Sequence, residues 1–320
     1  MPAPTATLPR FQNGARPQQL LTVLLGDYWH TRAEPVPSAA LVDLLQVFDV
    51  TASGARAAVQ RLAQRGFLVG SKTGRQTAYA VSPMSHERID SHVRALFMSH
   101  LPQDWDGAWT LVGYSLPDDA QGTRRLLRDH LRQLRFGNLY DALWVRPGYH
   151  LDSLNDLRSS FEGQMNPSQL TVFTGASLPD HSPLDSVQSA FGLPGLAEAY
   201  SEFIACWAPV ASKICDGSDP SRVDPFLAGS RPGEAALRLR TSVMADWRTL
   251  RRQDPQLPHE LLGENYPMHG AVSVCATLYD QLGPPAEAEF RRILHRHDER
   301  LAELVTHHTF AASASLLSTE

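Results

Sequence analysis

A run of basic residues without acidic ones is the feature of this sequence that points most directly to chemistry. Between Val50 and Ser82 the sequence has five cations and no carboxylate: Arg56, Arg61, Arg65, Lys72 and Arg75. The whole chain carries a formal charge of -5, so this positive excess is local. A local cluster of cations favours contact with phosphates, and the segment is therefore predicted to bind nucleic acid.

Three of these cations fall on a predicted helix whose two faces differ. Thr51 can cap a helix over TASGARAAVQRLAQRG, which Gly66 ends. Ala55, Val59 and Leu62 follow helical spacing and mark the face that packs on the rest of the domain. The opposite face then carries the polar residues Ser53, Arg56, Gln60 and Gln64.

The polar face has the residue types that read base pairs. Arg and Gln side chains can form paired hydrogen bonds with guanine and adenine edges, so we expect Arg56 and Gln60 to lie in a major groove. Arg61 and Arg65 lie at the flank and suit phosphates. For Arg61 an alternative stays open, in which it holds the helix by pairing with Asp43 or Asp49.

A basic hairpin is predicted directly after this helix. Two β-prone runs, FLVG and TAYAVS, are joined by SKTGRQ, whose Lys-Thr-Gly sequence suits a turn. Lys72, Thr73 and Arg75 lie in this hairpin, where they suit contacts to the DNA backbone or minor groove.

Two further helices are expected to position the polar one. Leucine-rich spacing predicts a buried helix from Pro17 that ends near Gly26. Ser38 is a candidate N-cap for a second helix with apolar residues at helical spacing. Helix, helix, helix and hairpin is the order of a winged helix-turn-helix.

The rest of the chain predicts two more parts, and the fold class is α+β multidomain. Strand-like runs at WTLVGY, ALWVRPG and LTVFTG alternate with helical patterns and suggest a ferredoxin-like α+β domain, whereas the later sequence is nearly all helical up to Phe310. The expected boundaries are 16–83 for the winged helix, 84–104 for a connector helix, 105–176 for the α+β domain and 185–312 for a helical effector or dimerisation domain.

Composition indicates an ordinary globular protein. The chain has 320 residues, of which 42% are hydrophobic and 20% charged, and no apolar run approaches the roughly 18–20 residues that span a bilayer. The start lacks the pattern of a secretion signal, so a cytoplasmic location is expected. Cys206, Cys215 and Cys275 lie far apart and form no CxxC pair, which disfavours disulfides and a cysteine zinc site.

Nothing in the sequence marks a catalytic or metal centre. GxSxG, P-loop, HExxH and GxGxxG motifs are absent from it. Asp118 and Asp119 follow the first strand of the α+β domain only after a proline, which disfavours a metal-dependent nuclease. Of the histidines near the C-terminus, neither His295 with His297 nor the adjacent pair His307 and His308 has ligand spacing on a helix. We expect no catalytic residues, no metal and no cofactor.

Three segments together resemble the PaaX-like family of phenylacetate-catabolism regulators. The first includes LLTVLLGDYW, ARAAVQRLAQRGFL and TAYAVSP. The second includes DWDGAWTLVGYS and RRLLRDHLRQLRFGNLYDALWVRP, and its fold is expected to be Cas2-like. The third is WRTLRRQDPQLPHELLGENYP. The likeness spans nearly the whole chain.

The resemblance implies a transcriptional repressor rather than an enzyme. It implies a homodimer that binds double-stranded operator DNA and is released by an aryl acyl-CoA, phenylacetyl-CoA in the namesake of the family. Binding to membranes is not expected, because no apolar run is long enough to span one. The alternative is a family member that works as an enzyme on an acyl or aromatic small molecule, or as a partner that does not bind DNA. An activator role at some promoters also stays open.

An acyl-CoA would need apolar walls for its acyl group and cations for its phosphates. The helical part of the sequence has both residue types. The candidate effector residues are Trp207, Arg238, Arg240, Trp247, Arg251, Arg252 and Tyr266.

Overall fold

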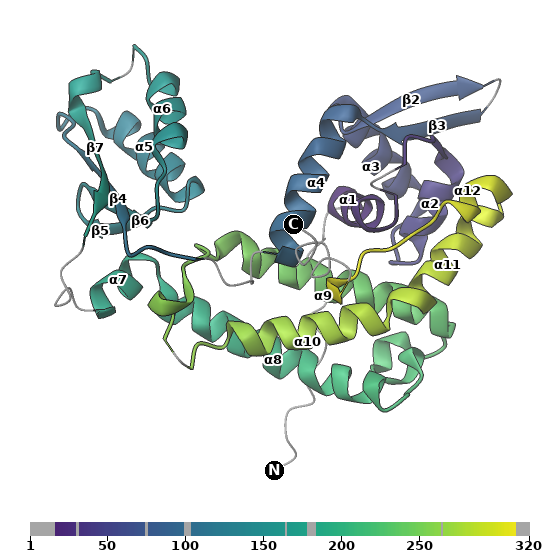
Figure 1. Ribbon diagram of the computed structural model, residues 1–320. Coiled ribbons are helices and arrows are strands. Elements are labelled where there is room, and N and C mark those ends of the chain that lie inside the picture. The colour runs from purple at the N-terminus through teal and green to yellow at the C-terminus, as the bar shows by residue number, and fades with distance from the viewer. Residues whose placement is uncertain are drawn as a thin grey trace. The chain divides into compact units, whose positions relative to one another are not determined.

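The structure is a computed structural model in which the chain forms two compact units (Figure 1). The model describes residues 17–29, 32–73, 76–98, 104–163, 165–177, 184–263 and 265–311. The first unit contains residues 1–99, 201–251 and 269–320, and the second contains residues 100–200 and 252–268. The domain boundaries expected from the sequence stay predictions.

The N-terminal part of the first unit has the element order and strand pairing typical of a winged helix. Its helices are α1 (Pro17–Tyr28), α2 (Ser38–Gln46) and α3 (Ala52–Gln64). Its strands are β1 (Val36–Pro37), β2 (Leu68–Thr73) and β3 (Gln76–Val81). The sheet is antiparallel with the order β1-β3-β2. We call residues 17–81 the winged-helix segment.

Three local features of this segment differ from the sequence prediction. Helix α1 continues through Gly26 to Tyr28, because the glycine lies on a helix that packing already stabilises. Ser38 is the first residue of α2 and Pro37 is its N-cap, so the expected serine cap is wrong. The proline-rich loop before α2 contains the short strand β1, which pairs with β3.

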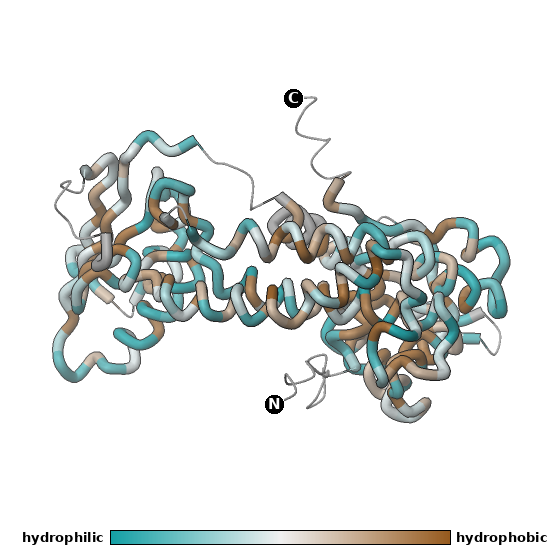
Figure 2. Tube along the Cα trace, turned by 90° about the horizontal axis from the view of Figure 1, so that it is seen from below, coloured by the Kyte–Doolittle hydropathy of each residue, from teal (hydrophilic) through white to brown (hydrophobic). Residues whose placement is uncertain are grey.

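Helices make up the rest of the first unit. After the connector α4 (Pro83–Met98), they include α11 (Gly283–His295), α12 (Glu299–Glu303) and most of α8 (Leu193–Cys215), α9 (Pro232–Gln253) and α10 (Met268–Gln281). Short 3-10 turns lie at Pro220–Arg222 and Pro225–Leu227. The hydrophobic residues of this unit gather toward its interior, and hydrophilic ones lie on the outside (Figure 2).

The helical pattern expected up to Phe310 is interrupted. Asp298 caps α12 by accepting hydrogen bonds from the backbone N–H groups of Arg300 and Leu301, which starts a new helix. The chain then leaves the helix after Leu304 and runs past α1 toward α9 and α10 (Figure 1). We call residues 304–311 the C-terminal strap.

The second unit is built on an antiparallel sheet in the order β5-β6-β4-β7. Its strands are β4 (Trp109–Tyr114), β5 (Gly137–Tyr140), β6 (Leu143–Pro147) and β7 (Leu170–Ala176). Helices α5 (Gln121–Gln133) and α6 (Leu151–Ser160) cover one face of the sheet (Figure 1). This unit also contains the turns Pro167–Gln169 and His259–Leu261, helix α7 (Leu184–Ala190) and the first residues of α8.

This sheet order and the two crossing helices are those of a ferredoxin-like fold, so the predicted α+β fold class is confirmed. Val112, Leu127, Trp144 and Leu154 belong to one buried cluster that joins the sheet to both helices. Strand β5 was not anticipated, because its short sequence GNLY has no alternating pattern. Within the described residues, none of the helices combines the length and apolar character required to span a membrane.

Candidate nucleic-acid interface

Helix α3 has a buried face and an exposed face, as its sequence pattern predicts. The Thr51 hydroxyl accepts a hydrogen bond from the Gly54 backbone N–H at 3.2 Å, so Thr51 is the predicted N-cap. Ala55, Val59 and Leu62 are buried, and Ala58 joins them. Gly66 has φ of 73° directly after the helix, a backbone conformation that favours glycine. Packing on this face fixes the direction in which the other face points.

The opposite face of α3 is open to solvent. Ser53, Arg56, Gln60 and Gln64 are all exposed, and helical spacing places them along one side. Arg61 and Arg65 are exposed at the flank of this row. The donors needed to contact base edges and phosphates therefore lie on one side of a single helix. Their roles in DNA binding stay predictions.

The predicted wing is an exposed hairpin. Lys72 lies opposite Thr77 in the β2–β3 ladder and is exposed, and the backbone of Thr73 pairs with Gln76. Arg75 lies outside the described residues. The hairpin continues from α3 without an intervening element, so Lys72 belongs to the same basic surface segment.

A hollow of about 520 Å³ lies between α2, α3 and β3. Arg56 of α3, Gln76 of β3 and Ser38 at the start of α2 line it together. The hollow therefore brings the candidate base-reading arginine next to polar residues of two other elements. His297, more than two hundred residues away in sequence, also lines it, and no local pattern could have indicated this.

The alternative in which Arg61 pairs with an acidic residue of the winged-helix segment is not the arrangement found. The Asp43 carboxylate lies 3.1 Å from the Arg296 guanidinium and 2.9 Å from His297 Nε2. Asp49 lies 2.5 Å from Arg238. Cations outside the winged-helix segment thus pair with the two carboxylates that the alternative assigned to Arg61.

The predicted effector tryptophans lie in the core of the first unit. Trp207 and Trp247 are completely buried. The indole N–H of Trp207 donates to the Asp246 carboxylate at 3.0 Å, and that of Trp247 donates to the Leu96 carbonyl at 3.2 Å. The two rings therefore contribute to packing in this structure, and their predicted contact with a ligand stays untested.

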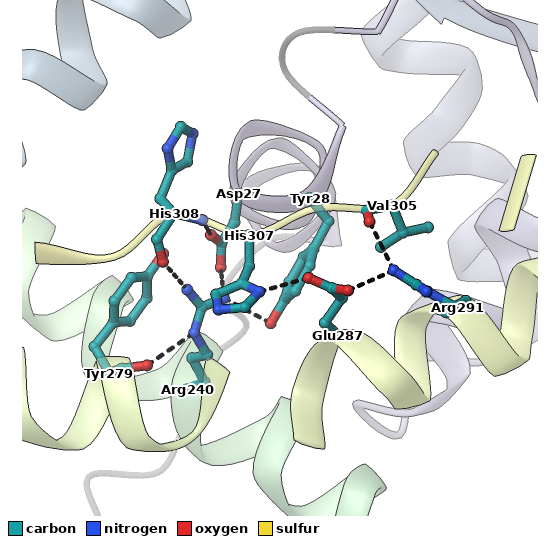
Figure 3. A network of polar contacts seen from close by, with 9 residues as sticks. All are labelled: Asp27, Tyr28, Arg240, Tyr279, Glu287, Arg291, Val305, His307 and His308. Atoms are coloured by element: carbon teal, nitrogen blue, oxygen red, sulfur yellow. Dashed lines mark hydrogen bonds and ion pairs between the residues drawn. The ribbon is translucent and has the colours of Figure 1, made fainter. Parts of the chain in front are cut away.

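Arg240 is buried within a network that satisfies its donors (Figure 3). It pairs with Asp27 and donates to the Tyr28 hydroxyl at 2.8 Å, to the Tyr279 carbonyl at 3.0 Å and to the His308 carbonyl at 2.5 Å. Burial lowers the pKa of Arg240, but the Asp27 carboxylate together with Tyr279 and Tyr28 raises it by more, so the pKa lies above its ordinary value and the guanidinium stays charged. A phosphate contact, as expected from the sequence, would require breaking these bonds.

The other four candidates lie in different environments. Arg238 is the partner of Asp49, and buried Arg251 lies 5.6 Å from the Trp247 ring. Arg252 is exposed and Tyr266 packs edge-on against Tyr200 with ring centroids 6.0 Å apart. These last two belong to the second unit, so the seven candidates do not form one cluster within either unit.

Comparisons with known proteins match the chain over three consecutive segments. The family models are described as a PaaX-like protein for residues 16–84, a PaaX protein central Cas2-like domain for residues 102–187 and a PaaX-like protein C-terminal domain for residues 191–292. The Cas2-like part of the predicted fold is thereby confirmed.

Two proteins extend the similarity over most of the chain. The transcriptional repressor PaaX of Escherichia coli (strain K12) is 24% identical over 272 residues, which cover 84% of this chain and 81% of the relative. A solved structure of an uncharacterized protein from Mycobacterium tuberculosis has a TM-score of 0.55 and 22% identity, with coverage of 85% of this chain and 97% of that chain. The solved structure supports the fold.

Proposed function

Because this chain belongs to the PaaX family, we propose that it is a transcriptional repressor that binds operator DNA through its winged-helix segment. The repressor acts as a cytoplasmic homodimer and is released by a small-molecule effector, an aryl acyl-CoA of the phenylacetyl-CoA type. Binding and release require no catalytic step, so the protein is not an enzyme. The repressor name of the Escherichia coli relative supports this function.

The observation that carries the proposal is the exposed row on α3. A major groove about 12 Å wide admits an α-helix, and it displays the acceptors that Arg and Gln recognise. Arg56 and Gln60 are exposed on the same side of α3, which suits base readout. Arg65 at the flank and Lys72 in the hairpin suit phosphate contacts on either side. Residues 50–82, which carry these side chains, include no acidic residue to repel DNA.

Base-reading and phosphate-binding residues differ in their expected response to substitution. Arg56→Ala and Gln60→Ala should each cost about 1–3 kcal/mol on the specific site and relax its specificity. Arg65→Ala should weaken binding to all sequences alike and lower the slope of log affinity against log salt by about 0.9, because one phosphate contact is lost. The two classes therefore separate in one set of titrations.

The test is fluorescence anisotropy of the full chain against DNA from its own upstream region at two salt concentrations. Wild type, Arg56→Ala/Gln60→Ala and Arg65→Ala are compared with Arg222→Ala, an exposed arginine outside the winged-helix segment. Phenylacetyl-CoA is added to the preformed complex, and light scattering gives the mass of the free protein. We expect wild type and Arg222→Ala to bind the operator equally tightly and with the same salt dependence, and the other variants to bind it more weakly. We also expect phenylacetyl-CoA to release the DNA and the free protein to have the mass of a dimer.

A failure of each part has a separate meaning. Specific binding without release keeps the repressor and discards the effector class. A monomer mass would remove the homodimer. The absence of specific binding to any upstream fragment would overturn the DNA-binding function itself, and the chain would then have to be assayed as an acyl-group enzyme.

A further inference from the structure

A pocket of about 320 Å³ lies inside the first unit, between the winged-helix segment and the helical part. Its walls come from α1, from the turn between α3 and β2, and from α4, α9, α10 and the C-terminal strap. The apolar lining includes Val23, Phe67, Ile89, Phe97 and Met244. Because the walls belong to both parts, an occupant would contact the winged-helix segment and the helical part at once.

The lining favours an aromatic group. Phe97 and Tyr279 both line the pocket, and their ring centroids lie 5.6 Å apart at an angle of 48°. The ring of His308 also lines it, 5.7 Å from that of Phe97. Aromatic rings prefer such tilted and edge contacts over parallel stacking at full overlap. A planar ring inserted among them would extend an arrangement that the protein already has.

The polar groups of the pocket favour an acid. The pocket lining contains the carboxylate of Asp27. Arg240 already neutralises this carboxylate, which also accepts a hydrogen bond from the His308 backbone N–H at 3.3 Å. Arg248 of α9 adds a guanidinium, whose several N–H donors can hold a carboxylate in addition to a protein partner. The strap fixes His308 by its backbone, and Figure 3 shows the imidazole pointing away from the Arg240 network.

The pocket volume of about 320 Å³ limits the size of the ligand. A water molecule takes about 30 Å³ of liquid volume, so about ten non-hydrogen atoms fit at a similar density. A single ring with a short acidic arm has this size. The nucleotide of a coenzyme A thioester would have to stay outside, with only its acyl end in the pocket.

We propose that this pocket binds a small aromatic acid, either free or as the acyl end of its thioester, and that this is the effector site. The effector role rests on the proposed function, whereas the binding site does not. Since a ligand shifts an equilibrium only through different affinities for two states, the occupant would favour a position of α1 and the α3–β2 turn that binds DNA less well.

Gly26 offers a direct way to fill the pocket. It lies on α1, lines the pocket and is half-buried. A Cβ atom at this position would lie 3.7 Å from Ile89 Cγ2, an ordinary van der Waals distance. Gly26→Ala is therefore compatible with the fold and narrows the pocket, and Gly26→Leu extends further into it. Gly122→Leu is the matched control, because Gly122 is an exposed position of α5 where an added Cβ atom would meet no other part of the chain within 4 Å beyond its own helix backbone and neighbours.

The experiment is isothermal titration of the full chain with phenylacetate, benzoate, phenylacetyl-CoA and coenzyme A alone. We expect an aromatic acid or the thioester to bind, with affinity reduced several-fold in Gly26→Ala and at least tenfold in Gly26→Leu. Gly122→Leu should retain the wild-type affinity, and coenzyme A alone should not bind. Thermal melting of each variant verifies that it is folded.

A second pair of variants tests the charge. Arg248→Gln should weaken the free acid several-fold, while Arg222→Gln, at an exposed position outside the pocket, should leave its affinity unchanged. Unchanged binding in folded Gly26→Ala would overturn the site. Binding of coenzyme A alone as tight as that of the thioester, or no binding of any aromatic probe, would overturn the ligand class.

Operator titrations with the same proteins separate this inference from the proposed function. If wild type binds its operator but none of the aromatic probes, the pocket assignment fails and the repressor stands. If a probe binds in the pocket but no operator is bound, the repressor fails and the ligand site stands. Gly26→Leu should bind operator and resist release by the ligand.

Discussion

Asp246 on α9 is a carboxyl group whose burial changes its titration. It accepts the indole N–H of Trp207 at 3.0 Å. Burial raises its pKa from 3.8 to about 6, although the hydrogen bond from Trp207 acts in the opposite direction. Between about pH 4 and pH 6, Asp246 is therefore protonated in the folded state and ionised in the unfolded chain. Stability from this group is present below pH 4 and falls as the pH rises through 6.

Asp246→Asn should remove this pH dependence. The amide oxygen can still accept the Trp207 N–H, and no charge is buried at high pH. We expect the free energy of unfolding of the variant to exceed that of wild type by about 3 kcal/mol at pH 8 and to differ little from it at pH 4. Urea denaturation at both pH values measures this, with exposed Asp156→Asn as the control. An equal change at both pH values would contradict the account.

The three cysteines should differ in reactivity for the same physical reason. Burial, together with the carboxylates of Asp246 and Asp224, raises the pKa of the Cys206 thiol to about 11. Burial also raises the pKa of Cys275 well above its ordinary value, whereas Cys215 is exposed. Because the thiolate is the nucleophile, iodoacetamide at pH 8 should modify Cys215 alone. Peptide mass spectrometry detects the product, and urea should make all three react.

At the scale of elements, one buried ion pair joins α1 to α9. Asp27 and Arg240 form it, and the Arg240 donors also reach α10 and the C-terminal strap (Figure 3). Asp27→Asn would leave a buried guanidinium without its counter-charge, at a cost of about 3–5 kcal/mol. Asp49→Asn is the matched control, because the Asp49 side chain is 77% exposed and such pairs contribute under about 1 kcal/mol.

Urea denaturation of both variants distinguishes the two pairs. A loss in Asp27→Asn no larger than that in Asp49→Asn would contradict a structural role for the buried pair. The double variant Asp27→Leu/Arg240→Met should recover part of the loss, since it removes both charges. Recovery of stability in the double variant is not expected if the loss arises only from altered packing of α1.

Periodicity in the sequence was sufficient to predict helices and strands whose buried face follows from the spacing of their own apolar residues. The exposed and buried faces of α3 and three of the four strands of the second unit follow from spacing alone. The break at Asp298 was not recognised, because the leucines on both sides continue a helical pattern. Arg240 was interpreted as a phosphate ligand, because its partners Asp27, Tyr279 and His308 are distant in sequence.

At the scale of the whole molecule, contacts between residues distant in sequence were also the part of the candidate interface that could not be predicted. The cation cluster and the polar row of α3 are continuous in sequence and were predicted. The hollow beside Arg56 was not, since Ser38, Gln76 and His297 approach it from three separate elements. Tertiary packing alone brings them together, and a single sequence has no signal for it.

The winged-helix segment packs against the helical part of the first unit through α1. Helix α1 buries most of its circumference, including Leu20, Leu21 and Leu24, and Tyr28 stacks on Phe290 of α11 with ring centroids 4.7 Å apart. A fragment of residues 16–84 would expose part of this surface and leave Asp27 without Arg240. Each fully buried large apolar side chain that becomes exposed costs roughly 1.5–3 kcal/mol, a large share of the stability of a small domain.

We therefore expect the fragment of residues 16–84 to be unfolded, or to melt at least ten degrees below the full chain, since roughly 1 kcal/mol shifts the melting temperature of a small domain by several degrees. A fragment of residues 102–192 is the control, because its core cluster from Val112 to Leu170 lies within it, and it should melt cooperatively. Circular dichroism melts of both fragments and the full chain measure this. A cooperative transition of the shorter fragment at the temperature of the full chain would show that α1 needs no partner outside the winged-helix segment.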